Sequence, residues 1–250
     1  MDNTPYILEE TENYAVIYKP PKMHCTSRNN TANESGDTLY DWYSAQTKYF
    51  FDVMHRLDYE THGLVLFAKN EKSFLFFKDL QDRGEFIKEY SAVVYSNIHH
   101  TEAQRHRDYY IGFPPCTPWL NYLPFSIESY FRPYGPGRKL VRPVVDIPKK
   151  HKEIAKDKGG FYKTEIINAE NNIFTVQIKR GFRHQIRCHL CWIGFPILND
   201  PLYTNKMYPN VTEVNPANRL ALRSHALYFT DPVSCEKKEY RIEPIKNTDI

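Results

Sequence analysis

The clearest hydrophobic pattern in the chain is the unbroken apolar run at residues 64–68, which follows a charged segment. A short apolar run with β-branched and aromatic members is typical of a buried strand. The segment before it contains His55, Arg56 and Asp58, which are poor candidates for packing. Gly63 lies between the two halves, where a chain often turns or approaches another segment closely. We therefore predict a charged loop that leads into a rigid core strand and could hold a reactive carboxylate still.

Other strands are predicted where β-branched and aromatic residues gather between turn residues. Pro20 ends the first of them, because its nitrogen cannot donate a hydrogen bond to a strand ladder. The last two are expected to pair through the polar segment 168–172. The predicted strands are residues 14–18, 64–68, 86–94, 161–167 and 173–178.

Two helices are predicted between the early strands. The first covers residues 38–51, with Asp37 as a possible N-cap and three apolar residues at helical spacing: Leu39, Trp42 and Tyr43. The second opens at Asn70 and Glu71 and ends at Gly84. Its stripe is expected to be core and consists of Phe74, Leu75, Phe77, Lys78 and Leu80.

Composition bounds the class of protein. The 250 residues suffice for one large domain or two small ones, with 41% apolar residues for a core. A net charge of +3 permits a nucleic-acid partner but does not require one. The apolar runs are far shorter than the roughly 20 residues of a membrane span, and the N-terminus has no basic start or apolar stretch. We therefore expect a cytoplasmic protein without membrane association.

The cysteines are interpreted as free thiols of a reducing compartment, because there are five of them in a long chain without a signal peptide. Cys188 and Cys191 form a C-x-x-C pair with His184 and His189 beside them. Zinc is conceivable there, but no second cysteine pair stands at a usual ligand spacing. We interpret these positions as helix residues and predict no metal.

The string around Asp58 closely resembles the His-Arg-Leu-Asp-x-x-Thr-Ser-Gly-Leu signature of the RluA family of RNA pseudouridine synthases. One position departs from the family, because His62 stands where the family has serine. The matching positions are His55, Arg56, Leu57, Asp58, Thr61, Gly63 and Leu64.

A second long match covers residues 181–203, where the family has Gly-x-x-His-Gln-Ile/Leu-Arg-x-His-Leu followed by Gly-x-Pro-Ile, Asp and Tyr. Every one of these positions is filled in this chain. Tyr90 fits the family's Lys-x-Tyr-x-Ala-x-Val strand, and Lys19 with Pro20 fits its Lys-Pro after the first strand. Structurally, we interpret Lys19 and Pro20 as a strand-ending turn.

The closing strand of the family, Arg-Leu-x-Leu-His-Ala, resembles residues 219–229 less closely. Here Arg223 and Ser224 replace the His-Ala pair. The resemblance covers roughly residues 14–94 and 160–244. It implies an α+β fold with a mixed, largely antiparallel central sheet, flanking helices and a catalytic cleft.

The resemblance also implies the chemistry. The family's catalytic nucleophile falls on Asp58, the arginine that pairs with it on Arg187, and a tyrosine facing the active site on Tyr90. A buried aspartate needs such a cation because burial raises its pKa and an adjacent arginine lowers it by about 1–3 units. Arg56 matches the family's arginine that fills the place of the extruded base. The family uses no metal or organic cofactor, and we expect none.

Residues 97–160 are a divergent insert rich in proline and aromatic residues. Its basic patch surrounds residues 135–137 and consists of Arg132, Arg138, Lys139 and Arg142. Two interpretations stay open: a rigid insert that contacts RNA backbone, and a solvated loop. The RNA-binding candidates are Arg56, Arg138, Lys139 and Arg183.

The expected protein is a monomer with a single catalytic domain over residues 1–250 and no separate N-terminal RNA-binding module. Its expected partner is a ribosomal or transfer RNA stem-loop. Two other functions remain open. A catalytically silent RNA-binding protein would not need Asp58, Tyr90 and Arg187 together. A carboxylate hydrolase such as a glycosidase would need a second carboxylate, for which Glu60 is the close candidate.

Overall fold

The computed structural model describes residues 4–26, 38–47, 49–95, 123–144, 161–204 and 219–246. The chain forms two compact units. Unit 1 comprises Met1–Tyr90 and Leu222–Pro244, and unit 2 comprises Ser91–Ala221 and Ile245–Ile250. Each unit contains its own cluster of buried apolar side chains.

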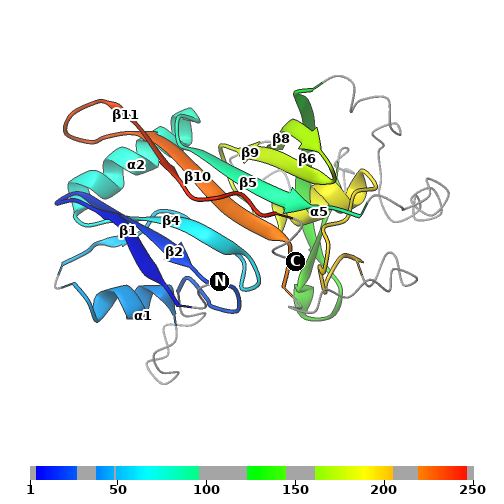
Figure 1. Ribbon diagram of the computed structural model, residues 1–250, viewed down its shortest axis with the longest axis horizontal. Helices are drawn as coiled ribbons and strands as arrows, with labels where there is room; N and C mark the ends of the chain where they lie inside the picture. Colours follow the sequence, from blue (N-terminus) through cyan, green and yellow to red (C-terminus); the bar gives the residue numbers. More distant parts are fainter. Residues whose placement is uncertain are drawn as a thin grey trace. The chain divides into compact units, whose positions relative to one another are not determined.

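The strands of unit 1 follow the order β1, β2, β4, β10, β5, with β3 paired to β4 and β11 paired to β10. β4 and β10 run parallel, whereas the β1–β2, β2–β4 and β10–β11 pairs are antiparallel. Figure 1 shows β10 in orange beside β11 in red. The bounds are β1 Tyr6–Glu10, β2 Tyr14–Lys19, β3 Asp52–Val53, β4 His62–Ala68, β5 Ile87–Val93, β10 Leu222–Thr230 and β11 Lys237–Arg241.

Gly63 is required by the parallel contact between β4 and β10. It pairs with Ser224 and has a φ of +121°, which L side chains rarely adopt. A Cβ atom at Gly63 would lie 2.1 Å from the Ser224 carbonyl oxygen, which no side-chain adjustment could relieve. The glycine of the signature therefore lets the last strand of the chain pack directly against β4.

Helix α2, Glu71–Arg83, begins and ends where its sequence predicts. The Asn70 side chain accepts a hydrogen bond from the Ser73 N–H, and Gly84 ends the helix in a left-handed conformation. Its buried residues are Ser73, Phe77 and Leu80. The prediction that Leu75 and Lys78 belong to the core is wrong, since Leu75 is 56% exposed and Lys78 is also exposed. Leu75 lies about 200° around the helix from Phe77, at 100° per residue.

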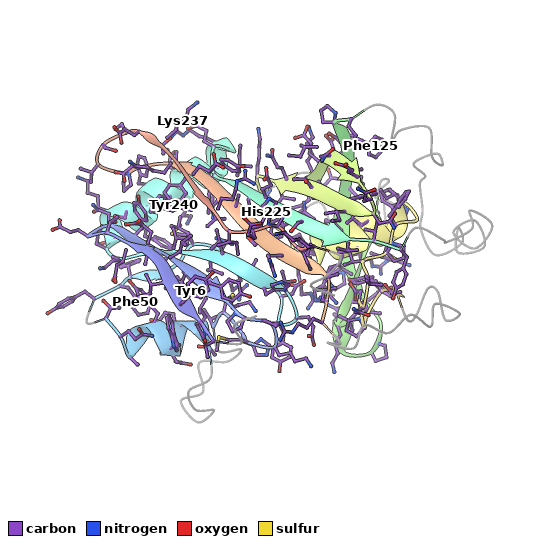
Figure 2. The ribbon with its side chains drawn as sticks, in the orientation of Figure 1. Tyr6, Phe50, Phe125, His225, Lys237 and Tyr240 are labelled. Carbon is purple, nitrogen blue, oxygen red and sulfur yellow. The ribbon has the colours of Figure 1, made fainter. Side chains whose placement is uncertain are left out.

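The first predicted helix is shorter than expected. Helix α1 covers Leu39–Ser44, and Thr38 and Asp41 form its capping box. The helix does not reach residue 51, because the Phe51 N–H donates to the Ala68 carbonyl and the following residues form β3 against β4. Phe50, labelled in Figure 2, contacts the Tyr43 ring of α1. The predicted cap at residue 37 lies outside the described residues.

The core of unit 1 lies between α2 and one face of the sheet. Phe77 of α2 makes edge contacts with the rings of Tyr14 and Phe229, which come from β2 and β10. Tyr240 of β11, also labelled in Figure 2, stacks on Phe229 and shares a hydrogen bond with the Tyr14 hydroxyl. Strands from both ends of the chain therefore share one aromatic cluster.

Unit 2 has antiparallel neighbours in the order β9, β8, β6, β7. Strand β5 begins in unit 1 and ends in unit 2. The β8–β9 hairpin confirms the two predicted strands, although its turn is confined to Asn171 and Asn172, both at positive φ. The bounds are β6 Phe125–Tyr134, β7 Leu140–Val144, β8 Tyr162–Glu170 and β9 Ile173–Ile178.

Helix α5, Gln185–Trp192, confirms that Cys188 and Cys191 are helix residues. It packs in a core with side chains of β6, β7 and β8, including Phe131, Val141 and Tyr162. Figure 1 shows α5 in yellow beside β6. Helix α5 therefore packs on β6 and β7, which belong to the insert between the two segments that resemble the family.

The described part of the insert is a β-hairpin, β6 and β7, with a short turn at Pro136–Arg138. Sequence patterns did not predict these strands, and the rest of residues 97–160 lies outside the described part of the chain. The predicted α+β fold with a mixed, largely antiparallel sheet is confirmed. Among the described residues, none of the helices has the length and apolar character needed to cross a bilayer.

Candidate active site

The loop that carries Asp58 is anchored through its backbone in unit 1. The Leu57 N–H donates to the Cys25 sulfur at 3.2 Å, and the Cys25 thiol donates to the Leu57 carbonyl at 3.6 Å. On the other side, the Thr61 N–H donates to the Asp58 carbonyl at 3.1 Å. Leu57 is buried, Asp58 is half-buried and Arg56 is exposed. The loop thus presents Arg56 and Asp58 from a fixed backbone.

Tyr90 of β5 is buried and belongs to the same unit as Asp58. Burial raises the pKa of its hydroxyl, and the negative charge of Asp58 raises it further. A hydrogen bond between the Tyr90 and Ser224 side chains acts in the opposite direction. The structure therefore brings Tyr90 within electrostatic range of Asp58, as a protonated hydroxyl at neutral pH.

Lys19 is a charged residue of this region, at a position where the sequence predicts a strand-ending turn. Its ammonium group is fully buried and donates to the carbonyls of Pro20 at 2.9 Å, Met23 at 2.8 Å and Tyr59 at 3.4 Å. Burial lowers the pKa of Lys19 to about 8, while the charges of Asp58 and other acidic groups raise it. Lys19 thus ties the loop after β2 to the Asp58 loop and adds positive charge near Asp58.

Two signature residues of unit 1 have packing partners. The His55 ring accepts a hydrogen bond from the Leu66 N–H at Nε2 and lies against the Phe86 ring. Burial, with a smaller effect of the Lys88 charge, lowers the pKa of His55 well below its usual value. His62 accepts a hydrogen bond from Arg223. These contacts give both histidines a role in holding β4 rather than in proton transfer.

Arg187 belongs to unit 2, where it forms a buried bidentate ion pair with Asp200. Its Nε and Nη2 atoms donate to the two Asp200 carboxylate oxygens, each at 2.8 Å. The side chains are 2% and 0% exposed. Asp200 also accepts hydrogen bonds from the Leu202 and Tyr203 N–H groups. Asp200 fills a position of the family motif in the sequence, but the motif does not indicate that Asp200 is the partner of Arg187.

Other residues of the 181–203 motif hold α5 against the strands. The Gln185 amide donates to the Lys163 carbonyl and the Thr164 hydroxyl, both at 3.0 Å. The two ring nitrogens of His189 lie 2.8 Å from the hydroxyls of Ser129 and Thr164. Gln185 and His189 of the motif therefore have a structural role, because they attach α5 to β6 and β8.

The zinc interpretation finds no support in the side chains around the cysteine pair. The Cys188 thiol donates to the Val141 carbonyl at 3.3 Å, and His184 Nδ1 lies 3.1 Å from the Tyr203 hydroxyl. Burial raises the pKa of the Cys188 and Cys191 thiols well above their usual value, which disfavours metal-binding thiolates. Within the described ranges, no group of three or more His, Cys, Asp or Glu could hold a metal ion.

Three of the RNA-binding candidates meet on unit 2. Arg183, just before α5, donates a hydrogen bond to the Arg138 carbonyl at the turn between β6 and β7. Arg138, Lys139 and Arg183 are all exposed, and we call them the basic hairpin surface. The fourth candidate, Arg56, belongs to unit 1. Lys139 also lines a hollow of about 320 Å³, together with Pro136, Gly137, Leu140 and Leu202.

The other basic residues of the predicted patch are less accessible. Arg132 and Arg142 face each other across the β6–β7 pairing, and both are half-buried. The Arg142 guanidinium lies 5.8 Å from the centre of the Tyr134 ring. The exposed positive charge of this hairpin is therefore concentrated at its turn.

The chain matches the family model described as RNA pseudouridylate synthase over residues 13–192. It is 27% identical over 243 residues to ribosomal large subunit pseudouridine synthase C of Rickettsia typhi, covering 96% of this chain and 67% of that protein. It is 29% identical over 225 residues to an uncharacterized RNA pseudouridine synthase of Helicobacter pylori, covering 89% and 70% respectively. The chain spans between 39% and 70% of the length of these and other curated relatives.

A similar fold is found among solved structures. Human RNA pseudouridylate synthase domain containing 1 superposes with a TM-score of 0.59 and 16% sequence identity, covering 96% of this chain and 84% of that chain. At this identity the likeness shows the fold. It extends over nearly the whole chain, including the residues of both units.

Proposed function

Because this chain belongs to the RluA family of RNA pseudouridine synthases, we propose that it converts specific uridines of a structured RNA to pseudouridine with Asp58 as the nucleophile. The observation that carries the proposal is the family match over residues 13–192, which contains the complete His-Arg-Leu-Asp motif. The match includes residues of both units, so we propose that they act as one catalytic domain.

The reaction breaks the bond between the sugar and the base, turns the base and rejoins it through carbon 5. A nucleophile for this step must stay ionised while water is excluded. The anchored backbone on both sides of Asp58 supports this role, because a catalytic group must be held in a fixed position. The buried Lys19 ammonium lies in the same unit, and the negative charge of Asp58 raises the pKa of Lys19.

We propose Tyr90 and Arg187 as the other catalytic residues. The raised pKa of Tyr90 favours a role as a neutral hydrogen-bond donor or packing group, since its hydroxyl keeps its proton at neutral pH. Arg187 is proposed to favour the charged form of Asp58. Its ion pair with Asp200 fixes the direction of its guanidinium, which is how a second carboxylate supports a catalytic arginine.

The proposed substrate is a stem-loop of ribosomal or transfer RNA. Ribosomal RNA is favoured by the name of the Rickettsia typhi relative, a ribosomal large subunit pseudouridine synthase. Arg56 and the basic hairpin surface would contact the RNA, because exposed arginine and lysine bind phosphates. We further propose that the protein acts as a monomer in the cytoplasm, without a metal or organic cofactor.

Incubation of the protein with uridine-containing RNA, followed by mapping of pseudouridine, tests the proposal. Isomerised uridine that appears with the wild-type chain and not with Asp58→Asn is the expected result. A silent RNA-binding protein would bind without forming product, and a hydrolase would release a free base. Either result would overturn the proposal. Mapping pseudouridines in cells with and without the protein then identifies the RNA.

A further inference from the structure

The residue next to Asp58 is an exposed aromatic side chain. Tyr59 is 42% exposed, and its ring centre lies 4.6 Å from that of His24 with an interplanar angle of 38°. His24 comes from the loop after β2 and Tyr59 from the loop before β4. The two rings are tilted against each other and form an aromatic pair, which we call the Tyr59–His24 stack; Tyr59 directly follows the proposed nucleophile in the chain.

The backbone under the stack is held from two sides. The buried Lys19 ammonium donates to the carbonyl of Met23, which precedes His24, and to the carbonyl of Tyr59 itself. On the other side, the Cys25 sulfur accepts a hydrogen bond from the Leu57 N–H, and the Cys25 thiol donates one to the Leu57 carbonyl. The two loops are therefore joined on both sides of the Tyr59–His24 stack. Binding of a ligand should cost little conformational entropy, because these loops are already ordered.

Packing explains this arrangement poorly. Tyr59 is not a member of the buried aromatic cluster that α2 forms with β2 and β10 in unit 1. A tyrosine that leaves two fifths of its surface exposed contributes little to a core, whereas a pre-ordered aromatic face is suited to binding. Other large apolar side chains are also exposed in the described loops of unit 1: Phe51 is 44% exposed, Val233 is 68% exposed and Tyr49 is 77% exposed.

The surroundings of the stack fit a nucleotide. Arg56 is exposed in the same loop and can reach a phosphate, while Lys19 adds buried positive charge beneath the backbone. Aromatic faces next to cationic groups bind unpaired bases, because every base has a face that can stack. A base that flips out of an RNA stem also leaves neighbours that have lost a stacking partner.

We propose that the Tyr59–His24 stack binds an unpaired base adjacent to the uridine that is modified. This inference rests on the proposed function and names a further RNA-binding residue of the same site. Tyr59 contacts the base and His24 supports the Tyr59 ring from the protein side. Because stacking reads no hydrogen-bonding edge, the subsite accepts any base and contributes affinity and orientation rather than sequence specificity.

Binding to a hairpin RNA with uridines in its loop tests the inference through four chains: wild type, Tyr59→Leu, Tyr59→Phe and the control Tyr49→Leu. Tyr59→Leu is expected to weaken binding about tenfold, the size of one base–aromatic contact. Tyr59→Phe keeps the ring and is expected to bind within about twofold of wild type. Tyr49→Leu removes a more exposed tyrosine of the same unit and is expected to bind like wild type.

The salt dependence of binding separates stacking from charge. The slope of affinity against salt should be unchanged in Tyr59→Leu, because stacking releases no counterions, and should flatten in Arg56→Ala. Equal affinities of wild type and Tyr59→Leu would overturn the inference, as would an equal loss in Tyr49→Leu. Melting curves of all variants verify that each is folded.

Photocrosslinking gives a second test that does not depend on a folded variant. The same hairpin with 4-thiouridine in its loop is expected to crosslink the wild-type chain at the peptide containing Tyr59. Crosslinks confined to other peptides would overturn the inference. Binding and crosslinking without isomerisation would leave the stack in place and overturn the catalytic proposal, so the two failures are distinguishable.

Discussion

Arg223 donates a hydrogen bond from Nε to Nε2 of His62 at a distance of 3.0 Å, across 161 positions of sequence. Both side chains are buried, and the two residues face each other in the parallel pairing of β4 with β10. Each is a departure from the family pattern, in which residue 62 is serine and residue 223 is histidine. The two departures therefore contact each other directly.

Replacing His62 or Arg223 alone should lower the free energy of unfolding more than replacing both residues together. His62→Ser takes the acceptor away from a buried guanidinium, which is expected to lower the free energy of unfolding by about 1–3 kcal/mol. The double variant His62→Ser with Arg223→His is expected to recover part of this loss, with a coupling energy of about 0.5–3 kcal/mol. Denaturant unfolding measures the cycle, and exposed Arg83→Gln is the control. Additive single effects would contradict the compensation.

Asp58→Asn should separate catalysis from folding. The substitution keeps the shape of the side chain and removes its charge and attacking oxygen, so single-turnover activity is expected to fall by more than about 10³-fold. Melting temperature and RNA affinity should stay close to wild type, because Asp58 is only half-buried. Asp79→Asn, an exposed carboxylate of α2, should leave all three properties unchanged. Substantial product from Asp58→Asn would refute its role as the nucleophile.

The two roles of Arg187 can be separated through Asp200. Arg187→Met leaves a buried carboxylate unpaired and is expected to destabilise the protein by about 3–5 kcal/mol. Replacing both partners, with Arg187→Met and Asp200→Leu, removes the unpaired charge and should restore much of the stability. If Arg187 also keeps Asp58 charged, this double variant stays inactive although it is stable. Recovery of both stability and single-turnover rate would reduce Arg187 to a structural role.

His189 should make the protein less stable in acid. Burial lowers its pKa to about 3, whereas the unfolded chain has a histidine pKa of about 6.5. Between these values the unfolded state binds a proton that the folded state does not bind. Stability therefore falls as the pH falls from about 6.5 towards 3, by about 1.4 kcal/mol per pH unit from this group. Above pH 6.5 the group contributes no pH dependence.

Urea unfolding of wild type and His189→Gln at several pH values below 7 measures this effect. Glutamine can still donate to one of the hydroxyls of Ser129 and Thr164 and accept from the other, but it does not titrate. The difference in stability between the two chains should shrink as the pH falls. A difference that does not change with pH would show that His189 is not held neutral.

The basic hairpin surface should set the salt dependence of RNA binding. Neutralising Arg138, Lys139 and Arg183 to glutamine removes exposed charges and is expected to weaken binding. The slope of log affinity against log salt should flatten by about 0.7–0.9 for each phosphate contact removed. Lys237→Gln, a charge on β11 in unit 1, serves as the control. An unchanged slope would leave this hairpin turn without a part in RNA binding.

Local sequence patterns correctly predicted the helices and strands that are specified by residues close together in the chain. Asn70 and Gly84 mark the ends of α2 because capping groups act on neighbouring N–H groups and on the local backbone angle. The apolar run after Gly63 became β4, and the alternating segments became β8 and β9. The motifs around Asp58 and Arg187 identified the family without any coordinates.

Patterns failed where the partner of a segment decided its structure. Residues 49–51 could extend a helix by periodicity, but pairing of β3 with β4 ends it earlier. The proline-rich hairpin of β6 and β7 carries weak strand signals, and it forms because β6 pairs with β8 and α5 covers it. Leu75 fits the apolar stripe in the sequence but is exposed in the structure. The position of the sheet determines which face of α2 is buried, and Leu75 lies outside that face.

The sequence by itself determined the family and the positions of Asp58, Tyr90 and Arg187, because motif residues are recognised by their order along the chain. Only the tertiary structure decided their partners. The bond of Lys19 to the Tyr59 carbonyl, the pairing of Arg187 with Asp200 and the contact of His62 with Arg223 join residues from separate elements. Hydrogen bonds and ion pairs depend on distance in space, and that distance is fixed by strand pairing and packing rather than by spacing along the chain.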